Sequence, residues 1–318
     1  MTESSRAGAV SKSTAAAPNV SPLLVLVVAL VGISASGPLV RSSHADPLAI
    51  AVWRLGLSLV VVAVALVVTG TWRDLRTLSA RQLLIAAGAG VMLALHFWSW
   101  NTSVHLTSVA ASVVLVNMHP PVVALLSALW LRERPRSKQW IGIAIAMAGA
   151  FVVAMGDARG TAGAASGRAL VGDMLALIGA VTVAIYFVSG RRLRASLALW
   201  PYVALVYGAA FITLTLIAVG RGVPLTGYPP RELGIFAALA IGPMLLGHTG
   251  LNYALRFLPA YVVNLTVLGE PIGATLIAML VPSIHETPGV ATVVGGAVTL
   301  CGVLLTAWAS ERPAAASA

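Results

Sequence analysis

The sequence predicts an all-α membrane protein, built from ten transmembrane helices in two inverted five-helix repeats. Three observations lead to this fold class: the composition, the spacing of the apolar runs and a similarity between the two halves of the chain. Of the 318 residues, 58% are apolar and only 9% are charged, and the mean hydropathy is +0.93. Soluble domains carry about 25% charged residues. Because one globular core cannot hide so much apolar surface, we expect lipid to be the solvent.

Ten apolar runs are each long enough to cross a bilayer, which takes about 20 residues of helix. They cover 22–40, 47–69, 82–101, 107–131, 139–156, 169–190, 199–219, 233–254, 261–281 and 289–309. Most connections are short, and the longest is the Gly/Ala-rich stretch 157–168. We therefore expect repeats over 22–156 and 169–309, with 157–168 as the linker. Tails over 1–21 and 310–318 are expected to be cytoplasmic, and the first of them disordered.

The net charge of +10 is interpreted as a topology signal. On a soluble protein it would suggest a nucleic-acid partner, but here the basic residues lie in short loops, and no nucleic acid is expected. With the N-terminus in the cytoplasm, the inside segments hold 14 Lys and Arg and the outside loops hold 5. Cytoplasmic loops are the ones enriched in Lys and Arg. This bias predicts a multi-pass protein of the plasma or inner membrane with both termini cytoplasmic, unless the run from Leu23 to Val40 is a cleaved signal peptide.

An internal repeat relates residues 101–149 to 252–302. The aligned pairs are Asn101 with Asn252, Pro120 with Pro271, Gly142 with Gly295 and Gly149 with Gly302. Five spans per half is an odd number, so the second half enters the bilayer upside down. Inverted repeats of this kind bind substrate near the midplane, where the halves meet. Pro120 and Pro271 lie about halfway along their spans, and the helix breaks that they cause are tolerated only beside protein or a water-filled cavity.

Three stretches resemble the EamA-like family of ten-helix proteins in the drug/metabolite transporter superfamily. They are LTSVAASVVLVNMHPPVVALLSALWLRERPRSKQWIGIAIAMAGAFVVA (106–154), GHTGLNYALRFLPAYVVNLTVLGEPIGATLIAML (247–280) and VVGGAVTLCGVLLTA (293–307). The proline of the fourth span, followed by the acid-containing loop from Leu131 to Pro135, is the most specific part. The resemblance covers nearly all of 22–309 and implies export or exchange of small molecules through a central cavity, without naming a substrate.

Glu270 is the only acidic residue deep within a predicted span. A lone carboxyl in a low-dielectric surrounding favours its neutral form, so it could take up and release a proton near neutral pH. It is a candidate for proton coupling or for binding a substrate amine. The alternative is a structural Glu that hydrogen bonds the backbone near Pro271. His119 is its repeat counterpart and is either a cavity residue or a polar filler at the Pro120 break.

Two His/Asn pairs occupy similar places in the two halves, His96 with Asn101 and His248 with Asn252. Within each pair the residues are four or five positions apart, so they lie near one helical face. Substrate contact and interhelical hydrogen bonding by the asparagines are both open. A metal site is not expected, because no carboxylate or cysteine accompanies the histidines at ligand spacing.

Four aromatic residues are candidates for a wall of the cavity: Trp98, Trp100, Tyr186 and Tyr261. For the two tryptophans, which lie near a span end, the interfacial aromatic belt is the favoured alternative. Arg54 lies about one third of the way into the second span. Snorkelling of its side chain to the outer interface is favoured over attraction of a substrate carboxylate or pairing with Glu270.

The single cysteine, Cys301, excludes an internal disulfide and is expected to be buried and inert. The sequence also lacks a Walker motif, which disfavours transport driven by ATP. We therefore expect a secondary transporter that exports small metabolites, such as amino acids or related compounds, by alternating access, with proton coupling as an option and without a cofactor. Its partners would be the small-molecule substrate and the lipid bilayer, and it would act as a monomer or homodimer. The alternatives are a channel or signalling membrane protein and, with less support, an intramembrane enzyme.

Overall fold

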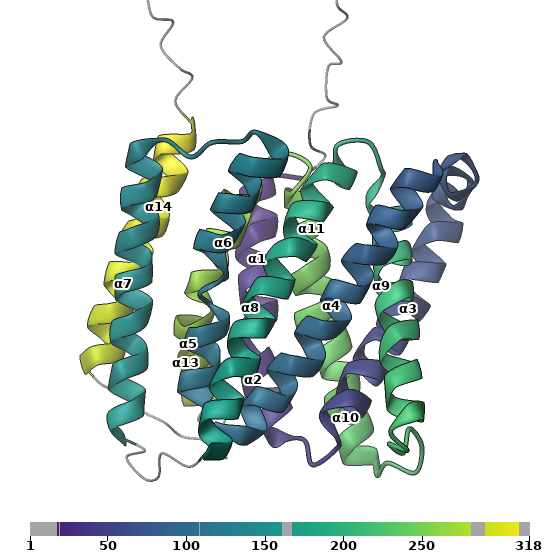
Figure 1. Ribbon diagram of the computed structural model, residues 1–318, viewed down its shortest axis with the longest axis horizontal. Helices are drawn as coiled ribbons and strands as arrows, with labels where there is room; N and C mark the ends of the chain where they lie inside the picture. Colours follow the sequence, from purple (N-terminus) through teal and green to yellow (C-terminus); the bar gives the residue numbers. More distant parts are fainter. Residues whose placement is uncertain (1–17, 19, 108, 161–166, 281–289, 312–318) are drawn as a thin grey trace, which may run out of the picture.

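The computed structural model is a bundle of helices that stand side by side (Figure 1). It describes residues 18, 20–107, 109–160, 167–280 and 290–311. Within these ranges all regular structure is helical. The described chain begins and ends at the same edge of the bundle, which we call the terminal edge. Nearly all of the two expected tails lies outside the described residues.

The first half contains five crossings of the bundle. They are α1 (Pro22–Ser34) with α2 (Ser36–Ser42), α3 (Pro47–Thr69), α4 (Ala80–Leu106), α5 (Val109–Val116) with α6 (His119–Leu126) and η2 (Ser127–Leu131), and α7 (Ser137–Gly160). A short 3-10 helix, η1 (Thr71–Thr77), joins α3 to α4. Pro38 explains why the first crossing is divided near Ala35, because its ring removes a hydrogen bond in the preceding turn.

The second half, as far as it is described, repeats this order. Its crossings are α8 (Gly167–Arg194), α9 (Leu199–Gly220), α10 (Pro230–Leu239) with η3 (Ala240–His248) and α11 (Thr249–Ala254), α12 (Ala260–Thr266) with η4 (Val267–Gly269) and α13 (Glu270–Leu280), and α14 (Val290–Glu311). The described helices thus group into ten crossings, which confirms the ten predicted helices. Helix α7 continues to Gly160, so only 161–166 of the predicted linker lie between it and α8.

Local sequence signals set where these helices begin and end. The side chain of Asp46 accepts a hydrogen bond from the Leu48 amide at the start of α3, directly before Pro47. Helix α3 ends at Thr69 and is capped by Gly70, whose positive φ of 68° suits glycine. Ser79 and Gln82 form a reciprocal capping box that begins α4. These caps satisfy backbone groups at helix ends, where the intrahelical bonds are missing.

Both proline-containing crossings are broken, as predicted. Helix α5 ends at Val116, a turn follows, and α6 begins at His119 with Pro120 in its first turn. In the ninth crossing the 3-10 segment η4 precedes α13, which begins at Glu270 with Pro271 next in the chain. Each break therefore lies just before its proline, because proline is accepted in the first turn of a helix but not in its interior.

The two halves run in opposite senses. Helix α1 begins at the terminal edge and α8 begins at the opposite edge (Figure 1). Across the bundle α7 packs against α14, and α3 against α9. A Cβ atom on Gly142 would meet the Gly302 carbonyl at 2.8 Å, and one on Gly149 would meet the Gly295 carbonyl at 2.6 Å. These two contacts exchange under the repeat alignment, as a twofold relation requires, and so agree with the predicted inverted repeats.

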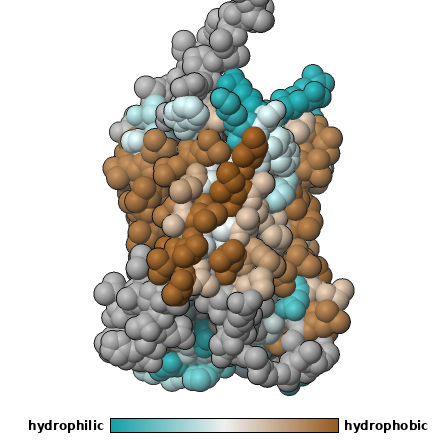
Figure 2. Space-filling model, turned by 90° about the vertical axis from the view of Figure 1, so that its left-hand side faces the viewer, coloured by the Kyte–Doolittle hydropathy of each residue, from teal (hydrophilic) through white to brown (hydrophobic). Residues whose placement is uncertain are grey.

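The outer surface of the bundle is apolar at mid-height. Figure 2 shows hydrophobic side chains across the side formed by α7 and α14, with hydrophilic residues above them. Six helical stretches of the described chain are long and apolar enough to cross a membrane. Cys301 is exposed on this surface, next to Leu300 and near Leu304, so the expectation of a buried cysteine was wrong. The sequence of this apolar helix does not show which of its faces contacts the lipid, because most of its residues are apolar.

Replacing Gly302 by alanine tests the close approach of α7 and α14. Its Cβ would lie 2.4 Å from the Ala146 backbone nitrogen and 2.6 Å from the Gly142 carbonyl oxygen. Because backbone atoms cannot move aside cheaply, Gly302→Ala should lower the free energy of unfolding by about 1–3 kcal/mol. The measurement is the thermal midpoint of the purified protein in detergent. The control is Gly88→Ala, where nothing lies within 4 Å of the added carbon; equal midpoints for both variants would contradict the packing.

Candidate functional site

A cavity lies inside the bundle where the two halves meet. It contains about 490 Å³ of space not filled by atoms, including its opening. Its walls come from α1, α2, α4 and the broken fourth crossing of the first half, and from α8 and the eighth and ninth crossings of the second half. The elements are repeat counterparts of one another. The cavity therefore lies at the inverted-repeat interface, as the two prolines predicted.

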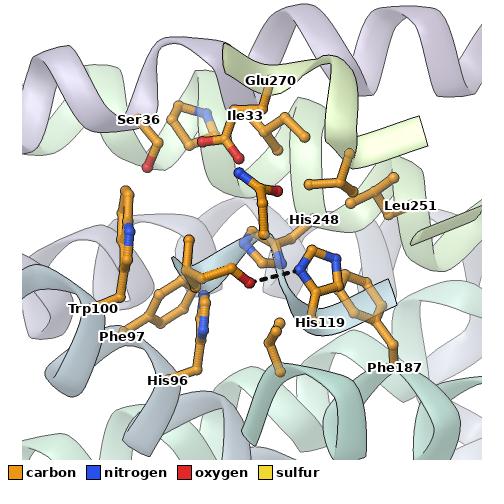
Figure 3. Close-up of a pocket in the computed structure, with 15 residues that line it drawn as sticks. Ile33, Ser36, His96, Phe97, Trp100, His119, Phe187, His248, Leu251 and Glu270 are labelled. Atoms are coloured by element: carbon orange, nitrogen blue, oxygen red, sulfur yellow. Dashed lines mark hydrogen bonds between the residues drawn. The ribbon is translucent and has the colours of Figure 1, made fainter. Parts of the chain in front are cut away.

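The two helix breaks each direct a polar residue to this cavity (Figure 3). His119 is the first residue of α6 and Glu270 the first of α13, and both line the cavity. The His119 ring lies 2.9 Å from the Val116 carbonyl through Nδ1, while its Nε2 has no hydrogen-bond partner. Asn117, in the turn between α5 and α6, also lines the cavity, and its side-chain amide donates to the Val113 carbonyl at 2.8 Å.

Two further histidines and several aromatic rings form the cavity wall. His96 stacks nearly parallel to Trp100, with ring centroids 6.4 Å apart, and lies 6.3 Å from His248. The Phe187 ring stacks on the His248 ring, with centroids 6.2 Å apart. The Nδ1 atom of His96 lies 3.0 Å from the Gly179 carbonyl on α8. The wall is thus apolar over most of its area and can hold a planar or apolar group.

The expectation that both tryptophans belong to an interfacial aromatic belt was wrong for Trp100. Trp100 is only 4% exposed and borders the cavity, so it does not belong to an interfacial belt. Trp98 is half-buried and packs against the core outside the lining. The reason is the length of α4, which continues to Leu106 and places Trp100 well inside the helix.

Asn101, Asn252, Tyr186 and Tyr261 are buried but do not border the cavity as described. The Asn252 amide donates to the Tyr186 hydroxyl at 2.5 Å and to the His248 carbonyl at 2.8 Å. Asn101 donates to the Pro47 carbonyl at the start of α3 at 3.2 Å. Both asparagines therefore form interhelical hydrogen bonds, one of their two predicted roles, and Asn252 supports the wall behind His248 without lining it.

Arg54 is inside the bundle, only 1% exposed, so the favoured snorkelling interpretation was wrong. Its guanidinium carbon lies 4.1 Å from the ring centroid of Phe97, which lines the cavity. This is the geometry of a cation–π contact. Helix α3 packs against α4 and α9, and this places the long side chain toward protein and away from the outer edge.

Polar contacts join the halves at both edges, and sequence reasoning missed them. At the terminal edge Arg191 on α8 forms an ion pair with Glu133 at 2.8 Å and also donates to the Leu255 carbonyl at 2.7 Å. At the opposite edge Glu232 on α10 accepts from the Ser43 hydroxyl at 2.5 Å. In the sequence, Glu133 belongs to the acid-containing loop of the family resemblance, and Arg191 is one of the basic residues counted on the cytoplasmic side; neither pattern predicts their ion pair. Asn117 was also missed, although its place two residues before His119 could have indicated it.

The described residues hold no group of three or more His, Cys, Asp or Glu side chains placed to share a metal ion. The three cavity histidines are instead spread around the wall on α4, α6 and η3. Their neighbours are aromatic rings and backbone carbonyls. This lining suits hydrogen bonding and ring contact with an organic ligand.

Ten crossings in two inverted halves, with a cavity at their interface, define a multi-pass membrane protein of the transporter class. The chain belongs to the EamA-like transporter family. The sequence model of this family matches residues 20–155 and, a second time, residues 170–308. The two matches correspond to the two halves of the bundle. The family assignment agrees with the resemblance found in the sequence.

Two relatives from Bacillus subtilis (strain 168) are similar to the chain. The uncharacterized transporter YdfC is 25% identical over 199 residues, which are 63% of this chain and 62% of YdfC. The chain thus spans less than two thirds of that relative. The uncharacterized transporter YyaM is 24% identical over 268 residues, 81% of this chain and 86% of YyaM. A solved crystal structure of a protein with 19% sequence identity has the same fold, with a TM-score of 0.75. The match covers 92% of this chain and 98% of the chain in that structure.

The hydrogen bond between Asn252 and Tyr186 can be tested with a double-mutant cycle. Asn252→Ala, Tyr186→Phe and the double variant are compared with the wild type by thermal unfolding in detergent. We expect a coupling energy of about 1 kcal/mol, because interhelical hydrogen bonds in membrane bundles contribute amounts of this size. Strictly additive effects of the two single changes would show that the hydroxyl and the amide do not interact.

Proposed function

We propose that the chain is a secondary transporter that carries a small metabolite across the membrane by alternating access. The cavity is bordered by both halves, and separate polar contacts join the halves at each edge of the bundle. If the Glu133–Arg191 contact opens, the cavity faces the terminal edge; if the Ser43–Glu232 contact opens, it faces the opposite edge. Relative motion of two repeats around a central site is the usual form of this mechanism.

The lining supports a small organic substrate, such as an amino acid or a related compound. Aromatic rings, among them Phe97, Trp100 and Phe187, provide apolar surface, and Glu270, Asn117 and His119 provide polar groups. A pocket with mostly apolar walls and a few placed polar groups is typical of small-molecule sites. A carboxylate at Glu270 would attract a substrate amine.

Glu270 is the observation that carries the proposed coupling to protons. It lines the cavity at the ninth-crossing break, beside the other lining residue Asn117, and is only partly exposed. Burial favours its protonated form and access to water favours its ionised form. Opening the cavity to one side of the membrane and then to the other would therefore let Glu270 carry a proton across. Import of protons would then drive export of substrate.

Replacing Glu270 by glutamine tests this coupling in proteoliposomes. Glutamine keeps the shape and the hydrogen-bonding ability but cannot release a proton. We expect Glu270→Gln to lose proton-gradient-driven accumulation, down to about the level of empty liposomes, and to lose its dependence on pH. Counterflow exchange of substrate should continue, because it needs no net proton movement. The transported compound is first found by comparing metabolites in the medium of overexpressing and deletion strains.

The matched control is Asp74→Asn, which neutralises an exposed carboxylate in η1 far from the cavity. It should transport like the wild type. Full gradient-driven transport by Glu270→Gln with unchanged pH dependence would rule out the coupling role. Saturable flux and trans-stimulation in the wild type are the properties that separate a carrier from a channel.

The orientation follows from the basic loops and can be tested by labelling. We propose that the terminal edge faces the cytoplasm, because Arg132, Arg134, Arg136 and Lys138 lie in the loop and first turn there. In a Cys301→Ser background, a membrane-impermeant maleimide should label Arg221→Cys on intact cells. It should label Arg134→Cys only after lysis. The reverse pattern would overturn the proposed topology.

A further inference from the structure

Arg54 is a buried cation whose hydrogen-bonding groups are unused. The side chain is only 1% exposed, and its Nε, Nη1 and Nη2 atoms each lack a hydrogen-bond partner. Burying a charged group is costly unless an opposite charge and hydrogen bonds compensate it. A position deep in α3 could carry leucine or methionine at no such cost. The unpaired guanidinium therefore points to an anion that is not part of the described chain.

The acidic side chains of the described residues do not supply that anion. Their ion pairs within 4.0 Å are Arg191 with Glu133 and Arg231 with Glu232, both at the edges of the bundle. Glu270 forms no ion pair with Arg54. The Tyr207 hydroxyl is neutral at pH 7 and is hydrogen bonded to Thr249 at 3.0 Å.

Arg54 contacts an aromatic ring that borders the cavity. The guanidinium carbon lies 4.1 Å from the centroid of the Phe97 ring, and Phe97 itself borders the cavity beside His96 (Figure 3). Arg54 is not among the lining residues. Contact between the guanidinium and a ligand in the cavity would therefore require the Phe97 ring to move aside. The ring contact is a weak substitute for hydrogen bonds, because it satisfies none of the N–H groups.

We propose that Arg54 is the anion subsite of the substrate pocket, covered by Phe97 when the pocket is empty, and that it selects ligands carrying a carboxylate. The planar guanidinium binds a carboxylate through two parallel N–H···O bonds. The aromatic walls at Trp100 and Phe187 would hold the apolar part of the same ligand. This proposal rests on the cavity being the substrate site, as argued above, and adds the charge that the substrate must carry.

A binding measurement without transport tests the subsite. The full-length protein in detergent is titrated with sodium benzoate, with benzamide, and with sodium chloride at the same ionic strength, and its thermal midpoint is followed. Benzoate and benzamide have the same ring and differ in the anionic group. We expect only benzoate to raise the midpoint, because ligand binding to the folded state stabilises it. No effect of benzoate, an equal effect of benzamide, or an equal effect of chloride would each overturn a carboxylate subsite.

Variants locate the effect at Arg54. Arg54→Gln should weaken benzoate binding about ten- to a hundredfold, as loss of a charge-assisted hydrogen bond does, and should remove the preference over benzamide. Arg54→Lys should retain part of it, since the charge remains without the planar fork. The control Arg221→Gln removes an exposed charge at the opposite edge and should bind benzoate like the wild type. Undiminished benzoate binding by Arg54→Gln would overturn the proposal.

A second measurement needs no variant and so does not depend on how Arg54→Gln folds. The wild-type protein is treated with phenylglyoxal, an arginine-selective reagent, and the modified peptides are measured by mass spectrometry. We expect modification at Arg54 that benzoate suppresses and benzamide does not. Failure of Arg54 to react while exposed Arg192 reacts would show that the Phe97 ring does not move aside, against the proposal. Because these readouts report binding, they are independent of whether Glu270→Gln changes transport.

Discussion

Two interruptions of the helical backbone, at Asn117–Met118 and at Val267–Gly269, are the constraint on which the site depends. Inside a bilayer a free backbone polar group is tolerated only against protein or a water-filled cavity. The breaks and the cavity therefore require each other. Pro120 and Pro271 fix where the helices resume, and the first residue of each resumed helix is a polar one, His119 and Glu270. Polar chemistry enters the middle of an apolar bundle through these two positions.

The same twofold relation that pairs the breaks also joins the halves by two different kinds of contact. Along α7 and α14 the backbones approach at Gly142 and Gly302 so closely that an added methyl would collide. Such packing resists sliding, because interiors of this density deform little. At the edges, Arg191 and Glu133 form an ion pair that is partly exposed to solvent, and such pairs contribute little stability. Motion between the halves is therefore expected to separate the edges while the glycine contact is kept.

Much of this arrangement was predictable because it follows from periodic or repeated features of the sequence. Span length, charge bias and the aligned prolines gave the ten helices and the site at the break. Residues whose role depends on rotation about a helix axis were not predictable in the same way. Cys301 lies outside the bundle and Trp100 inside it, although both belong to predicted transmembrane spans. The position of Arg54 was predicted wrongly because the side chain that it contacts, Phe97, lies on another helix and cannot be inferred from the sequence of α3.

The proposed roles of Arg54 and Glu270 are linked by electrostatics. Glu270 lines the cavity into which a bound carboxylate would place a negative charge. An anion at Arg54 would favour the protonated form of Glu270, and a proton on Glu270 would favour the anion, since coupling between two sites is reciprocal. Positive coupling of this kind favours movement of an anion and a proton together. Exchange of substrate against protons requires instead that the ligand displace the proton from Glu270, which the amine of an amino acid held at Arg54 by its carboxylate would do. The substrate that fits both proposals is therefore one that carries an amine as well as a carboxylate.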